Sequence, residues 1–247
     1  MSRSERRREA REGGSNMRKL YLVLAAVAIV GVAFVALSVG SGSGGAVVAP
    51  IEIEGLEDLE RLVALAQGVT RGDPDASIEI VEFGDYQCPA CMNFAGMIKP
   101  QIDLSYVETG QVRFIFYDFP LGGMHQHAFL AARAARCAND QDQFWEYHAH
   151  LFRMQPRWST ETRAVNTFVD YASDLGLDRG PFDECLKSDR HAEVVTANMY
   201  LGQQLGVSGT PTIMINKDGS VRRIPGDFLS IQAYIEDLLE EDGAGAS

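Results

Sequence analysis

The fold of this chain is decided by one segment, Val81-Glu82-Phe83-Gly84-Asp85-Tyr86-Gln87-Cys88-Pro89-Ala90-Cys91. The run over 78–84 is short, apolar on both faces and rich in β-branched and aromatic side chains, which predicts an interior β-strand. Two cysteines follow with two residues between them. Pro89 suits the first position of a helix, where the missing N–H of proline costs nothing. The segment therefore predicts a Cys-x-x-Cys pair where a buried strand passes into a helix.

A cysteine at the start of a helix has the setting that thiol–disulfide exchange requires. The sulfur of Cys88 would lie near unpaired backbone N–H groups and the positive end of the helix dipole, which lowers the pKa of a thiol. Cys91 falls one turn later on the same face, so the two sulfurs can close a small ring and reopen it. We expect Cys88 to be the attacking and leaving sulfur and Cys91 to resolve the mixed disulfide.

Two other interpretations of the cysteine pair stay open from the residues alone. The pair could form a static disulfide, or it could supply half of a zinc site. A zinc site would need two more ligands nearby, often from a second Cys-x-x-Cys. Cys137 and Cys185 are single cysteines far apart in the chain. The redox interpretation is therefore favoured, and no metal or cofactor is expected.

The segments that flank the motif predict a mixed α/β domain. The first strand, the helix that Cys88 opens and a strand over 112–119 form a βαβ unit with parallel strands. Pro100 lies within that helix and should kink it. The chain over 121–206 shows only helical periodicity. The other expected elements are helices over 126–139, 142–154, 160–175, 182–187 and 191–205, a β-hairpin with strands over 212–216 and 221–224, and a final helix over 228–240.

The N-terminal part of the chain predicts a single-pass membrane anchor. A basic tail over 1–19 has seven Arg or Lys and three Glu side chains, and the run over 20–39 contains no charge. Twenty apolar residues in a helix match the thickness of a bilayer core, and the basic flank places the N-terminus in the cytoplasm. A cleaved signal peptide is the alternative, although its apolar core would be shorter. A Gly/Ser linker over 40–50 follows, and the segment 51–75 should hold a helix over 52–67 and a turn.

Composition favours an exported globular domain and excludes a nucleic-acid-binding one. The apolar fraction of 46% is typical of a folded protein. The formal charge is −12, and because the N-terminal tail is basic, the rest of the chain is more acidic still. Such a body repels nucleic acid. Outside the cytoplasm disulfides form and persist, so the expected topology also favours a redox role for the cysteines.

The Cys-x-x-Cys segment resembles the active-site segment of the DsbA family of thioredoxin-like proteins. A second segment, Val207-Ser208-Gly209-Thr210-Pro211-Thr212, is similar to the other landmark of that family. The resemblance implies that Pro211 is a cis-proline facing the cysteines and that Thr210 presents its backbone to a bound substrate chain. An ordinary trans turn proline is the alternative.

The resemblance covers roughly residues 70–240. It implies a thioredoxin fold, βαβ and then ββα, interrupted by an all-helical insertion. The expected parts are the first half of the thioredoxin-like domain over 76–120, the helical insertion over 121–206, the second half over 207–240 and a tail over 241–247.

The resemblance also assigns a role to an acid in the first strand and to the remaining cysteines. Glu82 lies within an otherwise apolar strand, and in thioredoxin-like proteins a buried acid at the matching place accepts the proton of the second cysteine. A carboxyl held there should have a raised pKa. Solvent exposure of Glu82 is the alternative, and Glu79 is expected to be solvated. Cys137 and Cys185 resemble a paired-cysteine pattern of the family, which implies a structural disulfide, with two free buried cysteines as the alternative.

The residues and the resemblance together predict a membrane-anchored thiol–disulfide oxidoreductase that acts on exported proteins with free thiols or disulfides. Pro89 resembles the first intervening residue of DsbA-like oxidants, whereas Ala90 stands where the best-known ones have histidine. An oxidase is favoured, and a reductase of the same fold stays open. The oxidase would need a quinone-linked membrane partner, and the reductase an electron-feeding one. The alternatives from other classes are a copper or zinc chaperone that uses Cys88 and Cys91, and a non-catalytic peptide-binding module.

Overall fold

The computed structural model describes residues 46–245, with side chains up to residue 241. The expected basic tail over 1–19, the membrane span over 20–39 and most of the linker lie outside the described residues. Within the described part of the chain, no helix combines the length and the apolar character needed to cross a membrane.

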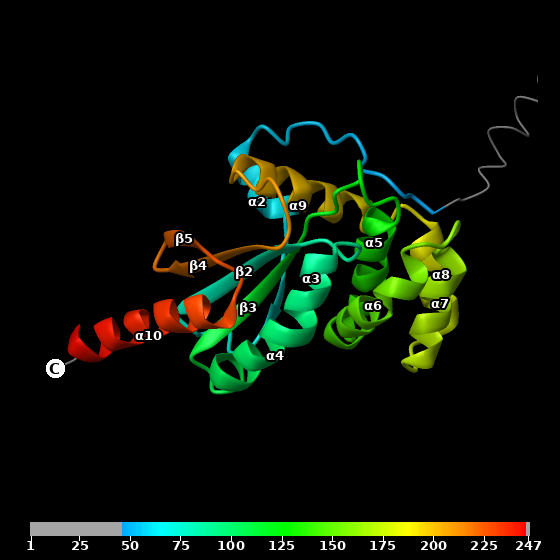
Figure 1. The fold of residues 1–247 in the computed structure, drawn as a ribbon. Coiled ribbons are helices and arrows are strands. Elements are labelled where there is room, and N and C mark those ends of the chain that lie inside the picture. Colours follow the sequence, from blue (N-terminus) through cyan, green and yellow to red (C-terminus); the bar gives the residue numbers. More distant parts are fainter. Residues whose placement is uncertain (1–45, 246–247) are drawn as a thin grey trace, which may run out of the picture. The chain divides into compact units, whose positions relative to one another are not determined.

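A five-stranded mixed sheet forms the centre of the domain (Figure 1), with the strand order β1-β3-β2-β4-β5. β2 and β3 are parallel, while β1, β4 and β5 each run antiparallel to the strand beside them. The bounds are β1 Val69–Arg71, β2 Ile78–Gly84, β3 Val112–Asp118, β4 Thr212–Lys217 and β5 Ser220–Ile224. The parallel β2–β3 pair confirms the predicted βαβ unit, and β4 with β5 confirms the hairpin.

β2 is the central strand, and the acidic residues on its two faces have different surroundings. Ile78, Ile80 and Glu82 share one face and are fully buried. The two isoleucines belong to the same apolar core as Phe94 of the helix that follows β2. Glu79 on the other face pairs with Arg113 and accepts a hydrogen bond from Asn216 at 2.5 Å. The expectation that Glu79 is simply solvated is therefore wrong, since the neighbouring strands bring a guanidinium and an amide to it.

The helix that starts at Pro89 alternates between α and π turns. Lys99 N donates to Phe94 O, the spacing of a π turn. Pro100 has no N–H to give to an α-helical partner, and π turns flank the short α-helix that contains it. The disturbance expected at Pro100 takes this form. The successive pieces are α3 Pro89–Asn93, η1 Phe94–Ile98, α4 Lys99–Ile102 and η2 Asp103–Val107.

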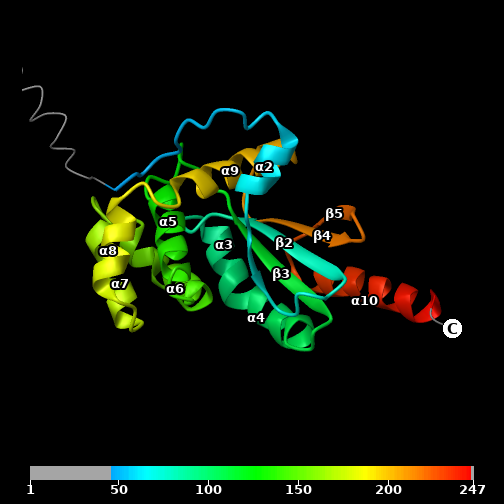
Figure 2. The ribbon, with the colours of Figure 1, turned by 180° about the vertical axis from the view of Figure 1, so that it is seen from behind.

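Helices cover both faces of the sheet (Figures 1 and 2). The helix from α3 to α4 lies with α10 on one face, and α9 lies with α2 on the other. The helical insertion stands beside the sheet and ends in α9, as the two views agree. The bounds are α2 Leu59–Leu65, α5 Ala128–Asn139, α6 Phe144–Trp158, α7 Val165–Asp174, α8 Arg179–Lys187, α9 Ala192–Gln204 and α10 Phe228–Gly245. The thioredoxin-type arrangement with an all-helical insertion is thereby confirmed.

Three segments differ from the prediction. The helix expected over 52–67 is shorter, because Gly55 adopts a left-handed φ of 78° and Asp58 caps the helix later by accepting from Arg61 N at 2.8 Å. β1 was not predicted, since three residues are too few to show alternation. α10 continues into the expected tail and ends at Gly245.

Candidate active site

Cys88 is the N-cap residue of α3, where the sequence predicts it. Its backbone is extended, and Pro89 takes the first helical position. A hydrogen bond from the Cys91 side chain is the largest of the effects that lower the pKa of Cys88 from 9.0 to about 5. Burial acts in the opposite direction, while hydrogen bonds from Thr210 and from the Cys91 and Ala90 backbones lower the pKa further. Cys88 is therefore a thiolate at neutral pH in the reduced protein.

The Thr210–Pro211 peptide bond is cis and lies against this sulfur. In its thiol form Cys88 donates from Sγ to the carbonyl oxygen of Thr210 at 3.4 Å. Two segments separated by 122 residues thus meet at one sulfur atom. The structure places the backbone of Thr210 beside the cysteine that an incoming chain would have to reach.

Cys91 and Glu82 have no exposed surface, whereas Cys88 is 8% exposed. Burial raises the pKa of Cys91, and its hydrogen bond to Cys88 and the charge of Glu82 raise it further. Burial also raises the pKa of Glu82 from 4.5 to about 8, an increase that the ammonium group of Lys99 reduces. Neither carboxyl oxygen of Glu82 has a hydrogen-bond partner within the described part of the chain. A carboxyl that is protonated at neutral pH therefore lies near both cysteines.

Comparisons with known proteins agree with a thioredoxin-like site. Residues 65–237 match the profile of a family described as Thioredoxin. The chain is 32% identical over 170 residues to the disulfide bond formation protein D of Bacillus subtilis (strain 168), and the match covers 68% of this chain and 76% of that protein. The chain belongs to the DsbA-like thioredoxin family.

Solved structures of the family share the fold. BdbD from Bacillus subtilis, in its oxidised form, superposes with a TM-score of 0.62 at 29% identity, covering 79% of this chain and 99% of the other. The α-DsbA1 protein of Wolbachia pipientis superposes with a TM-score of 0.64 at 19% identity over 73% of this chain and 94% of its own, which is a likeness of fold. The DsbA-like chain is accordingly a thiol–disulfide oxidoreductase, as its cysteine motif predicts.

Asp85 is a buried member of this DsbA-like site that sequence reasoning missed. Its backbone N–H points to Cys91 Sγ at 3.5 Å. Its carboxylate accepts hydrogen bonds from Gln87 N at 2.7 Å and Leu121 N at 2.8 Å, and it contacts His125 Nδ1 at 2.7 Å. Asp85 therefore links the loop between β2 and α3 to the loop after β3. A polar residue directly after a buried strand was the available signal.

The helical insertion reaches the same loop through polar side chains. Tyr86 Oη bonds to Nδ1 of the buried His148 on α6 at 2.9 Å. Gln87 accepts from His127 N at 2.8 Å and donates to Ser159 O at 3.0 Å. The residues that precede Cys88 are thus attached to the insertion on one side and to the sheet on the other.

Cys137 and Cys185 are joined in a disulfide with an S–S distance of 1.99 Å, bridging α5 and α8 as the resemblance implies. Among the described residues, their sulfurs and the His191 ring are the one group of three possible metal ligands within 4.8 Å of one another. Both sulfurs are already bonded to each other. The structure therefore holds one cysteine pair free and one pair closed.

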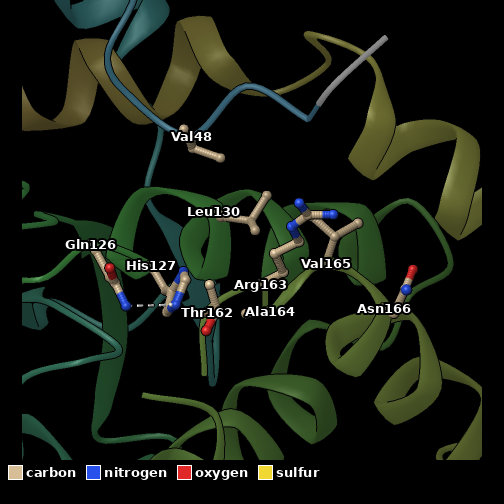
Figure 3. Close-up of a pocket in the computed structure, with 9 residues that line it drawn as sticks. All are labelled: Val48, Gln126, His127, Leu130, Thr162, Arg163, Ala164, Val165 and Asn166. Atoms are coloured by element: carbon tan, nitrogen blue, oxygen red, sulfur yellow. Dashed lines mark hydrogen bonds between the residues drawn. The ribbon is translucent and has the colours of Figure 1, made fainter. Parts of the chain in front are cut away.

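A mainly apolar pocket of about 390 Å³ lies in the helical insertion, near the active-site loop (Figure 3). Figure 3 shows Val48 from the N-terminal segment opposite Leu130 of α5 and the side chain of Arg163. His127, which lines the pocket, also carries the backbone N–H that holds Gln87. The full lining is Val48, Gln126, His127, Leu130, Thr162, Arg163, Ala164, Val165 and Asn166.

Proposed function

We propose that this chain oxidises dithiols of exported proteins, with Cys88 as the exchanging sulfur and Cys91 as its partner. The observation that carries the proposal is the setting of Cys88, a cysteine at a helix start whose pKa is lowered to about 5 beside the Thr210 carbonyl. A strongly stabilised thiolate favours the reduced enzyme and leaves easily from a mixed disulfide. Both properties suit an oxidant.

The proposed reaction starts from the Cys88–Cys91 disulfide. A substrate thiolate attacks Cys88 Sγ, the S–S bond breaks, and Cys91 leaves as a thiolate that takes a proton from Glu82. The second substrate thiolate then attacks the substrate sulfur of the mixed disulfide and expels Cys88 as a thiolate. The substrate loses two electrons and its thiol protons, and the enzyme ends with a Cys88 thiolate and a Cys91 thiol. Glu82 is reprotonated from solvent, and its pKa of about 8 suits transfer in either direction.

We further propose that the run over 20–39 anchors the domain outside the cytoplasmic membrane, where a quinone-linked membrane partner reoxidises Cys88 and Cys91. The support is the uncharged run itself and the basic tail before it. A membrane-impermeant maleimide, applied to intact cells after mild reduction, should label Cys88. Labelling only after lysis would contradict the proposed topology.

The direction of electron flow is tested by equilibrating the purified chain with glutathione buffers and separating the oxidised and reduced forms. An oxidase of this type should have a potential well above that of thioredoxin, toward roughly −120 mV. A value near −270 mV, typical of thioredoxin, would overturn the proposed direction and favour a reductase. Tight copper or zinc binding by the reduced chain, with no exchange activity, would favour a metal chaperone instead.

A further inference from the structure

One side chain of the helical insertion bonds directly to the backbone of the active-site turn. Gln155 lies near the end of α6, is 4% exposed, and donates from Nε2 to Tyr86 O at 2.7 Å and to Cys88 O at 2.9 Å. These contacts join residues 69 and 67 positions apart. Both protons of one amide group are thereby given to the two carbonyls that flank Gln87.

The carbonyl of Cys88 is also where the active-site helix begins. Met92 N donates to Cys88 O at 3.1 Å, which is the first hydrogen bond of α3. The peptide groups that follow directly carry the N–H groups of Ala90 and Cys91, which stabilise the Cys88 thiolate. Fixing the Cys88 carbonyl from a second direction therefore fixes the angle between the sulfur and those donors. Removing this amide would leave the carbonyl groups of Tyr86 and Cys88 without that donor.

We propose that Gln155 is a positioning residue through which the helical insertion sets the reactivity of Cys88. It touches neither the sulfurs nor the place of the substrate, and it acts through the Cys88 carbonyl. The inference rests on the proposed role of Cys88. It also gives the insertion a part in the chemistry, because Gln155 belongs to α6.

The test compares Gln155→Met with a matched Gln203→Met control in the full chain. Methionine keeps the length and flexibility of glutamine and removes both donors, and Gln203 is exposed on α9. Thiolate absorbance near 240 nm is followed against pH in the reduced protein, and the equilibrium with glutathione is measured alongside. In Gln155→Met the pKa of Cys88 should rise by about one unit and the equilibrium should shift about tenfold toward the disulfide, or about 30 mV. The control should match the wild type.

The outcomes separate this inference from the proposed function. A wild-type Cys88 that titrates like an ordinary thiol would overturn the proposed function. A wild-type Cys88 with a low pKa that Gln155→Met leaves unchanged, with equal destabilisation of the oxidised and reduced forms, would overturn the inference alone and leave Gln155 a packing residue.

Two further measurements cover a Gln155→Met protein that does not fold. Gln155→Asn keeps a buried amide but shortens the side chain by one methylene, so the pKa of Cys88 should rise by less than in Gln155→Met. In the wild type, selective ¹⁵N-glutamine labelling should reveal a slowly exchanging Gln155 amide whose NMR signals shift as Cys88 titrates. Fast exchange, or signals indifferent to that titration, would contradict the inference.

Discussion

The chain has two cysteine pairs, which differ in their bonding state and in their exposure. Cys137 and Cys185 come from two helices of the insertion, are buried, and are closed in a disulfide. Cys88 and Cys91 share one helical turn, are free, and one of them reaches the surface at the helix start. Both pairs can form the same kind of bond, so their different roles follow from access, helix position and nearby titratable groups.

The acidic residues beside the two pairs also differ in their surroundings. Glu82 lies near Cys88 and Cys91 with a pKa raised to about 8. Asp140 lies 3.7 Å from Cys185 Sγ of the closed pair, but its carboxylate already contacts His191 at 3.0 Å and Arg190 at 3.3 Å. The carboxylate of Asp140 is thus engaged by a guanidinium and an imidazole, whereas the carboxyl oxygens of Glu82 have no hydrogen-bond partner within the described residues.

The sharpest way to break the comparison is to remove sulfurs from each pair in turn. Cys88→Ser should lower disulfide exchange to the uncatalysed rate, because a hydroxyl cannot replace the thiolate nucleophile. Cys91→Ser should trap mixed disulfides with substrate, visible on non-reducing gels. Cys137→Ser with Cys185→Ser should keep exchange activity within a few-fold. Loss of activity in this double variant, in a folded protein, would show that the closed pair takes part in the chemistry.

The closed pair should instead dominate stability. Opening the bridge between Cys137 and Cys185, which are 48 residues apart, should lower the free energy of unfolding by about 4 kcal/mol on the chain-entropy account. Denaturant unfolding of the double serine variant, with the active-site pair held reduced in both proteins, measures this directly. An unfolding free energy equal to that of the wild type would mean that the bridge adds no constraint.

Glu82→Gln should slow proton transfer at Cys91, while the pKa of Cys88 should stay below that of Cys91. The carboxyl supplies or accepts the proton, so the rate of the Cys91 step should fall by about 10²-fold, measured by stopped-flow reduction and reoxidation.

Because the pKa of Glu82 is raised in the folded chain, its ionisation destabilises the fold as the pH rises from about 4.5 to 8. The glutamine variant should therefore gain stability relative to the wild type across that range. A constant difference at all pH values would contradict the raised pKa.

The last expected effect is a pH-dependent stability difference between the oxidised and reduced forms. The pKa of Cys88 is lowered from 9.0 to about 5 in the folded reduced protein. Its thiolate therefore stabilises the reduced fold fully above pH 9, and this contribution is lost as the pH falls toward 5. Melting temperatures of the two forms, measured at several pH values, should converge at low pH and separate as the pH rises. The Cys137–Cys185 bridge is present in both forms and cancels.

The sequence determined the parts of this protein whose information is local. Cys88 and Pro89 identify a redox helix start because capping and thiolate stabilisation need only neighbouring residues. The order of strands and helices follows from periodicity, and the Thr210–Pro211 landmark came from its resemblance to a family. The membrane anchor over 20–39 stays a prediction from composition, because those residues lie outside the described part of the chain.

Only the tertiary structure decided which distant side chains complete the site. Asp85 lies in the active-site loop and points its N–H to Cys91, and His148 and Gln155 bond to the same loop from α6. No helical or strand period marks a polar residue for such a contact. The pKa of Glu82 likewise depends on its complete burial in the folded domain, although its place in the strand was readable. Hydrogen bonds and desolvation act between atoms that folding brings together, so their partners are fixed by packing across the chain rather than by spacing along it.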